Sequence, residues 1–128
     1  MVVIDTSIVI DHLRQKTKIR SYLVKLVEKH PKNELAISVL SVQELYEGRS
    51  TRDVNQEKIL LATISPLRIL PYNYETAKMA GEIARDLAET IQFADAAIAA
   101  TAIVNGGQLA TLNKKDFQKI RDLDFFNF

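Results

Sequence analysis

The chain contains no cysteine, only four glycines and three prolines, and no apolar run long enough to cross a membrane. The absence of cysteine excludes disulfide bonds, thiolate zinc sites and cysteine nucleophiles, and it suits a reducing compartment. The longest apolar stretch, Ala96 to Val104, falls well short of the ~20 residues that a membrane-spanning helix needs. The N-terminal segment has no basic stretch before its apolar residues, unlike a secretory signal. We therefore expect a cytoplasmic protein without a membrane segment.

An excess of charge of one sign is also missing. The 17 Lys and Arg residues nearly balance the 16 Asp and Glu residues, and the net charge is +1. Total charge therefore does not indicate a nucleic-acid partner, and only the distribution of charge can. The 128 residues are 47% hydrophobic and 26% charged, which is typical of a globular chain of one domain. Because no repeat, linker or low-complexity tract divides the sequence, we predict a single domain over residues 1–128.

Short apolar runs alternate along the chain with segments of helical spacing. The predicted strands cover residues 2–4, 35–38, 67–70 and 109–112, with a further edge strand over 123–128. The predicted helices form a hairpin over 8–30 and then cover 41–48, 53–64, 75–89, 93–104 and 113–120. Ser41 and Glu44 have the spacing of a capping box, so the helix over 41–48 is predicted to begin at Ser41. The alternation predicts an α/β fold: a mostly parallel sheet of four to five strands with helices on both faces.

Four carboxylic acids lie where predicted helices begin after strands or in a first helical turn. They are Asp5, Glu44, Asp95 and Asp116. The carboxyl ends of parallel strands meet at one edge of a sheet, so we expect the four side chains to face that edge. Each acid taken singly is also explained by helix capping or by the helix dipole. The four together favour a shared site.

Asp95 is the most informative of the four, because it lies within the apolar sequence ADAAIAA and no Lys or Arg occurs between Arg85 and Lys114. A buried carboxylate needs a partner, which must come from elsewhere in the fold or be an ion. Crowded carboxylates raise one another's pKa values unless a cation neutralises them, and oxygen ligands suit Mg²⁺ or Mn²⁺. Such an ion activates water and stabilises charge on phosphate oxygens, so the pattern indicates phosphodiester hydrolysis.

Four segments together resemble the PIN-domain ribonucleases, in particular the VapC toxins of bacterial and archaeal toxin–antitoxin pairs. In chain order they are Asp5-Thr6-Ser7, Ile37-Ser38 with Glu44-Leu45 and Gly48, Asp95 to Ala102, and Thr111 to Phe117. The resemblance spans nearly the whole chain and implies an endoribonuclease that depends on Mg²⁺ or Mn²⁺. It also implies an RNA substrate, a homodimer, and a cognate antitoxin whose tail occupies the active-site groove.

The resemblance assigns roles to individual residues. It implies that Asp5 and Asp95 are the principal metal ligands, joined by Asp116. It further implies that Glu44 and Asp116 complete the acidic pocket, by binding a second ion or by positioning water. The polar positions that line this pocket correspond to Thr6, Thr111 and Asn113. The chain departs from the family at Ser7, where Asn is common.

Several basic residues lie near the motif segments and are candidates for binding RNA phosphates. The preferred three directly follow motif residues or lie among them: Arg49, Lys114 and Lys115. The others are Lys16, Lys18, Arg20, Arg52 and Lys119. His12 and His30 lack metal-site spacing and are predicted to be surface or helix-end residues. Phe125, Phe126 and Phe128 are predicted to pack in the core or at the sheet edge rather than to stack on bases.

Two other function classes share part of this pattern. A phosphoaspartyl enzyme or receiver-like switch also has an acid after its first strand and binds Mg²⁺, but such families usually carry a second acid beside the first. Here Thr6 and Ser7 occupy those places. A non-catalytic binding module, with the acids serving as caps or as a vestigial site, is the third class. Because this chain retains all four acids, a decayed site is the less favoured interpretation.

Overall fold

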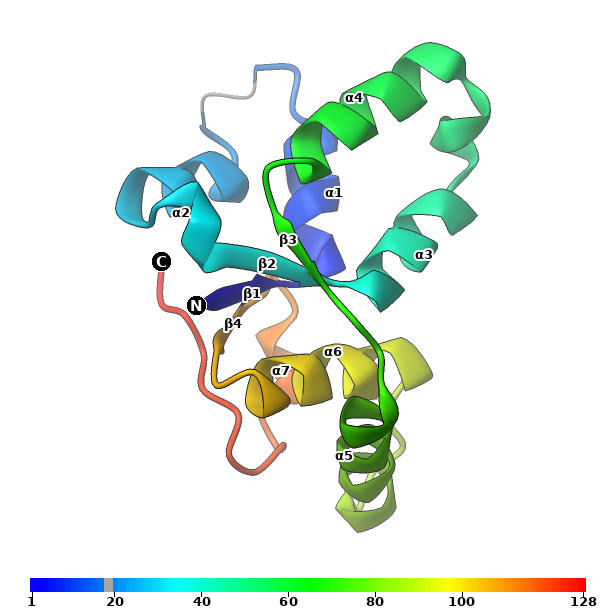
Figure 1. Ribbon diagram of the computed structural model, residues 1–128, viewed down its shortest axis with the longest axis vertical. Coiled ribbons are helices and arrows are strands. Elements are labelled where there is room, and N and C mark those ends of the chain that lie inside the picture. The colour runs from blue at the N-terminus through cyan, green and yellow to red at the C-terminus, as the bar shows by residue number, and fades with distance from the viewer. Residues whose placement is uncertain (18–19) are drawn as a thin grey trace.

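A parallel sheet of four strands, in the order β3-β2-β1-β4, forms the centre of the molecule in the computed structural model (Figure 1). The structure describes residues 1–17 and 20–128, so Lys18 and residue 19 of the predicted hairpin lie outside the described residues. The strands are β1 (Val2–Ile4), β2 (Leu35–Ser38), β3 (Arg68–Leu70) and β4 (Gln108–Ala110). The predicted parallel α/β architecture is confirmed.

Helices cover both faces of the sheet (Figure 1). On one face lie α1 (Thr6–Arg14), α2 (Tyr22–Lys29), α3 (Val39–Glu47) and α4 (Val54–Ile64), and on the other lie α5 (Tyr74–Asp86), α6 (Phe93–Val104) and α7 (Lys114–Phe117). The short 3₁₀ helices η2 (Lys32–Glu34) and η3 (Arg49–Arg52) lie in connections. Successive strand residues point to opposite faces, so Val3 packs in the core beneath α5 and α6, whereas Val2 and Ile4 pack beneath α1 to α4.

The alanine-rich helix α6 is buried along almost its whole length, because every residue from Ala96 to Ala102 is buried. Small side chains let this helix approach both the sheet and α5 closely. It ends where Gly106 adopts a φ of 67°, a left-handed conformation that favours glycine. The amide of Gly107 then donates to the carbonyl of Ala102 at 2.8 Å and satisfies the end of the helix.

The start of α3 differs from the prediction. The helix begins at Val39, and its cap is Ser38, whose Oγ accepts a hydrogen bond from the Leu40 amide at 3.1 Å. The predicted capping box of Ser41 and Glu44 is wrong, because the last residue of β2 caps the helix with no linker between strand and helix. Ser41 therefore lies inside the helix, where its buried Oγ has no hydrogen-bond partner within residues 1–17 and 20–128.

Other element ends shift by a few residues. The helix α5 ends at Asp86 rather than 89, β4 ends at Ala110 rather than 112, and α7 ends at Phe117 rather than 120. The predicted last strand, residues 123–128, is reduced to one parallel bridge between Leu109 and Phe125. No helix in the described part of the chain has the length and apolar character needed to cross a membrane.

The two serines of α3 give a direct test of this cap assignment. We expect Ser38→Ala to lower the stability by about 1 kcal/mol, because it removes the N-cap acceptor. We expect Ser41→Ala to leave the stability unchanged or to raise it, because a buried hydroxyl without a partner is replaced by a strong helix former. Thermal and urea unfolding of the two variants measure the contrast. A greater loss in Ser41→Ala than in Ser38→Ala would contradict the assignment.

Candidate functional site

Asp5 lies at the point where the strand order reverses. The chain runs from β1 outward to β2 and β3, whereas β4 pairs on the other side of β1. Ligands of open α/β sheets generally bind at such a point, beyond the carboxyl ends of the strands. Asp5 directly follows β1, is 4% exposed, and its amide donates to the carbonyl of Ala110 at the end of β4 at 2.9 Å.

The side chain of Asp5 is held by hydroxyl groups and does not cap α1. Its Oδ2 accepts a hydrogen bond from Ser7 Oγ at 2.7 Å and another from Thr111 Oγ1 at 2.7 Å. Thr111 Oγ1 also accepts from the Asn113 amide at 2.9 Å, and Ser7 Oγ accepts from the Leu112 amide at 3.1 Å. The carboxylate is therefore fixed by one hydroxyl from α1 and one from the segment that follows β4. Ser7, at the position where the resembling family commonly has Asn, takes part in this network.

Glu44 reaches the site from α3. Its Oε1 accepts a hydrogen bond from Thr6 Oγ1 at 2.7 Å, across 38 residues of sequence. Glu44 lies in the second turn of α3 rather than in the first, because the helix starts earlier than predicted. The predicted pocket residues Thr6 and Thr111 thus each orient one of the candidate carboxylates, Thr6 that of Glu44 and Thr111 that of Asp5.

Asp95 lies in the first turn of α6 and is partly buried. Burial, and after it the negative charges of Asp5, Asp116 and Glu44, together raise the pKa of its carboxyl to about 6. No hydrogen bond or ion pair to the Asp95 carboxylate occurs among the residues that the structure describes. The four predicted acids therefore come close enough to repel one another, and Asp95 has no neutralising partner within this part of the chain.

Asp116 lies in the short helix α7 and is exposed. It lines a pocket of about 350 Å³ together with Asp95, Gln92 and Lys115. Asn113 lines a different pocket, which also contains Ser7. Neither Asp116 nor Asn113 caps α7 with its side chain. Capping explains none of the four acids in this structure.

The chemistry of these donors fits a hard divalent cation, because every one is an oxygen. The described residues contain no group of three or more His, Cys, Asp or Glu side chains placed to bind one ion together. Mg²⁺ keeps several water molecules and is usually bound by one or two carboxylates, completed by substrate phosphates. A site with one fixed carboxylate, Asp5, and one unneutralised carboxylate, Asp95, matches that mode of binding.

The candidate RNA-binding cations are distributed unevenly around the acids. Arg49 lines a pocket with Glu44, and Lys115 lines the pocket of Asp95 and Asp116. Lys114 lies over the ring of Phe125 at 4.9 Å from its centroid, and Lys119 pairs with Glu89. The sequence patterns did not identify Arg14, the last residue of α1, as a candidate. This arginine lines two pockets, one with Asn113 and one with Glu44. No motif marks this arginine, and only the folded chain brings it near Glu44 and Asn113.

The two histidines lie outside this site. His12 Nδ1 is 2.7 Å from Ser21 Oγ, and His30 Nδ1 is 3.4 Å from Glu34 Oε2. Phe126 packs edge-to-face on His30 and on Phe128. Phe125 is partly buried against the core beneath α6. These contacts agree with the predicted structural roles of the histidines and of the C-terminal phenylalanines.

Comparison with known families gives a match of residues 2–123 to the PIN domain. Among curated proteins, Ribonuclease VapC10 of Mycobacterium tuberculosis is 36% identical over 126 residues, which are 96% of this chain and 90% of that protein.

Solved structures with the same fold include two toxin–antitoxin assemblies. VapBC2 from Rickettsia felis, bound to a DNA fragment from its promoter, matches with a TM-score of 0.82 and 24% identity over 100% of this chain and 99% of the other. DNA-bound VapBC from Salmonella typhimurium matches with a TM-score of 0.85 and 22% identity over 98% and 96% of the two chains. At these identities the two structures support the fold.

The raised pKa of Asp95 predicts how stability depends on pH. In the unfolded chain this carboxyl ionises near its usual value of 3.8, whereas in the folded chain it ionises near about 6. Stability is therefore lost as the pH rises through this interval, and the full loss is present above it. We expect Asp95→Asn to be more stable than the parent above about pH 6 in EDTA, by roughly 1 kcal/mol after allowance for solvent screening.

Urea unfolding at about pH 4 and about pH 7.5 measures this difference, which is expected only at the higher pH. Asp86→Asn is the matched control, because the Asp86 carboxylate is exposed and paired with Arg85, which lowers its pKa. A gain of stability in Asp86→Asn equal to that in Asp95→Asn would show that the effect is not specific to the acidic site.

Proposed function

This chain belongs to the PIN domain family, and from that premise we propose that it is a metal-dependent endoribonuclease, the toxin of a VapBC-type toxin–antitoxin pair. The observation that carries the proposal is the partly buried Asp95 carboxylate, whose pKa is raised by burial and by three other carboxylates and which forms no ion pair within the described chain. A cluster of this kind is stable at neutral pH when a divalent cation neutralises it. The similarity to Ribonuclease VapC10 over 96% of the chain supports RNA as the substrate.

PIN-domain ribonucleases are in general dependent on a divalent metal, and we propose Mg²⁺ here, with Mn²⁺ as a functional substitute. Asp5 and Asp95 would hold the ion directly, and Asp116 would take part in the same site. When bound, the ion lowers the pKa of a coordinated water and stabilises negative charge on the phosphate oxygens. The resemblance to the family and the all-oxygen donor set both support this assignment.

The chain's own residues would orient the acids and the attacking water. Ser7 and Thr111 donate hydrogen bonds to Oδ2 of Asp5. These bonds hold the carboxylate in one orientation and thereby fix the direction of its other oxygen, Oδ1. Thr6 holds Glu44 in the same way. We propose that Glu44, which lines a different pocket from Asp116, positions the attacking water or a second ion. Such preorganised groups need little rearrangement during the reaction.

The alternative of a phosphoaspartyl or receiver-like protein loses its support, because the match to the PIN domain covers residues 2–123. The places that a second acid takes in those families are held by Thr6 and Ser7, which instead donate hydrogen bonds to carboxylates. A PIN-like module that binds without cutting is distinguished from a nuclease by the cleavage assay below.

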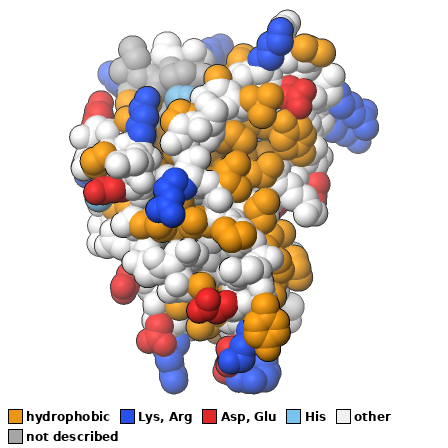
Figure 2. Space-filling model, viewed as in Figure 1, with side chains coloured by type: hydrophobic (Ala, Val, Ile, Leu, Met, Phe, Trp, Pro, Cys, Tyr) orange, Lys and Arg blue, Asp and Glu red, His pale blue; other side chains and the backbone are white. Residues whose placement is uncertain are grey.

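We also propose a homodimer, a cognate antitoxin and a cytoplasmic location. Figure 2 shows hydrophobic side chains gathered over α4 and β3 and continuing to the start of α5. Exposed large hydrophobic residues of these elements are Val54, Ile59, Leu61, Ile69 and Tyr74. Contiguous apolar surface of this kind marks protein interaction sites, and β3 lies at the end of the sheet. This surface supports a contact between two copies of the chain.

Cleavage of RNA tests the proposed activity. We expect Mg²⁺ or Mn²⁺ to support cleavage and EDTA to abolish it. Asp5→Asn and Asp95→Asn should each lower kcat/KM by at least about 100-fold, because loss of a residue that only supports a metal ligand already lowers activity about 10- to 100-fold. Thermal melting supplies a second readout, because Mn²⁺ should raise the Tm of the parent but not of Asp95→Asn. Asp86→Asn, outside the site, should match the parent. Activity that survives both substitutions, or that resists EDTA, would refute the mechanism.

Purification tests the two protein partners. Expressed alone, the chain should elute as a dimer, and expressed with the product of an adjacent small gene it should elute as a complex with that product. Ile69→Arg should give a monomer, because it places a charge on the exposed apolar surface of β3. Phe128→Arg changes an equally apolar exposed residue at the C-terminus and should remain dimeric. A monomeric parent, measured by light scattering, would rule out the dimer.

A further inference from the structure

Arg14, the last residue of α1, lies in the wall between two pockets beside the acidic site. One pocket contains Ser7 and Asn113, and the other contains Glu44 and Arg49. Ser7 belongs to the hydrogen-bond network of Asp5, and Glu44 is one of the four carboxylates. Arg14 therefore brings positive charge to the border of the site on two sides.

The positive charge of Arg14 is not used by the fold. The nearest acid of the same helix face, Asp11, already accepts hydrogen bonds from Gln15 Nε2 and from the Tyr22 amide, both at 3.1 Å. Within residues 1–17 and 20–128 no ion pair or hydrogen bond engages the Arg14 guanidinium, which is exposed. Its position in the last turn of α1 is favoured by the helix dipole, but this leaves all its side-chain donors available.

The direction of α1 aims this side chain at the site. Side chains on a helix lean toward its N-terminus, which for α1 is the end that follows Asp5. Ile10, one turn before Arg14, lines the same two pockets. Arg14 thus lines one pocket that contains Asn113 and a second pocket that contains Glu44.

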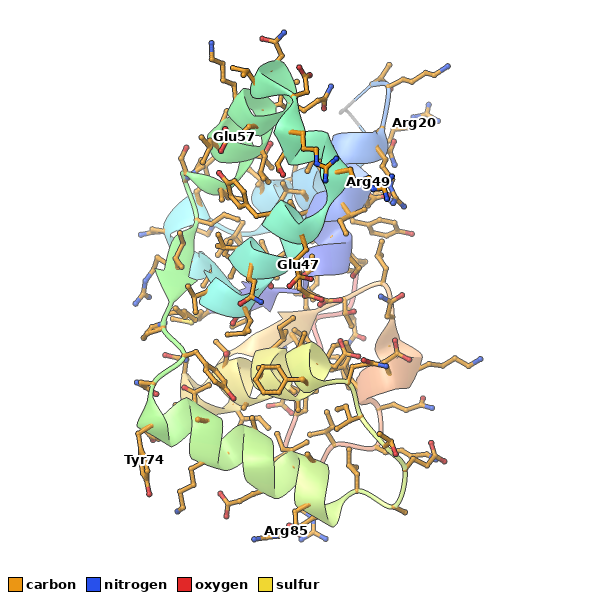
Figure 3. All side chains as sticks on the ribbon, turned by 90° about the vertical axis from the view of Figure 1, so that its right-hand side faces the viewer. Arg20, Glu47, Arg49, Glu57, Tyr74 and Arg85 are labelled. Atoms are coloured by element: carbon orange, nitrogen blue, oxygen red, sulfur yellow. The ribbon has the colours of Figure 1, made fainter. Side chains whose placement is uncertain are left out.

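Arg49 supplies a second guanidinium from the start of η3. It shares with Arg14 a pocket of about 360 Å³ whose apolar walls are formed by Ile10, Leu13, Leu45 and Leu60. Figure 3 shows Arg49 beside α1. Guanidinium groups bind phosphate oxygens in a bidentate manner, and the apolar walls suit the faces of a ribose and a base.

We propose that Arg14, together with Arg49, binds a phosphate of the RNA substrate next to the scissile one. This inference rests on the proposed function. The acidic site repels phosphates, so the substrate needs cations at its flanks. Lys115 lies on the opposite flank, with Asp95 and Asp116. The shared pocket with Glu44 favours a nucleic acid that enters the site over a protein ligand.

The experiment compares Arg14→Ala and Arg14→Lys with Lys78→Ala, which removes the same charge at an exposed position of α5 outside both pockets. Cleavage kinetics are measured with a short fluorescein-labelled single-stranded RNA of mixed sequence and Mn²⁺. Binding of the same RNA is measured by anisotropy in EDTA, as a function of salt. Thermal melting confirms that each variant is folded.

We expect Arg14→Ala to raise KM and the dissociation constant about 10-fold with kcat unchanged, the effect of one charge-assisted hydrogen bond. The slope of log affinity against log salt should fall by about 0.7, as for one phosphate contact on a single strand. Arg14→Lys should restore that slope and part of the affinity, because lysine keeps the charge but loses the bidentate geometry. Lys78→Ala should match the parent.

Three outcomes would overturn the inference. If the parent cleaves RNA in an Asp95-dependent manner but Arg14→Ala behaves as Lys78→Ala does, the nuclease function stands and the role of Arg14 is wrong. If Arg14→Ala releases a co-purifying protein partner without changing RNA affinity, the pocket is a partner site. If the parent neither binds nor cleaves RNA, the proposed function itself fails, and the assignment of Arg14 fails with it.

Discussion

The parallel alignment of β1 with β2 and β4 is the constraint on which the acidic site depends. It brings the end of β1, where Asp5 lies, between the ends of the strands that lead to Glu44 and to Asp116. The hydrogen bond from Thr111 to Asp5 joins residues 106 positions apart and spans the point where the strand order reverses. Only a parallel arrangement places these strand ends together, so the position of each acid follows from the sheet before any local preference acts.

The same arrangement is unfavourable for the isolated fold. Burial and three neighbouring carboxylates raise the pKa of Asp95 to about 6, and no cation of the described chain compensates. The helix that carries Asp95 supplies no compensating cation itself, since it contains no lysine or arginine from Phe93 to Val104. The fold therefore holds negative charge that a bound cation would relieve, and a functional site is where such local conflict between stability and chemistry is expected.

The sequence was sufficient to predict the fold class, each strand and the residues of α6, because hydrophobic periodicity and the Gly106 stop signal are local. It was insufficient for the start of α3. Both Ser38 and Ser41 have the chemistry of a cap, and the choice depends on where β2 releases the chain. The convergence of the four acids was predictable from strand-end geometry. The partners that hold them, Thr6 on Glu44 and Ser7 on Asp5, were not, because hydroxyl hydrogen bonds between distant segments leave no periodic signal.

The near-zero net charge of the chain conceals two opposite local fields. Carboxylates occupy the centre of the carboxyl edge, while Arg14 and Arg49 on one flank and Lys115 on the other line its pockets. In the proposed function, RNA phosphates are attracted to the flanks but repelled from the centre until a cation binds there. Cation and RNA each reduce the electrostatic cost of binding the other, and by thermodynamic linkage this coupling is reciprocal. Charge separation over a few residues, rather than overall basicity, would then let an almost neutral protein bind a polyanion over an acidic site.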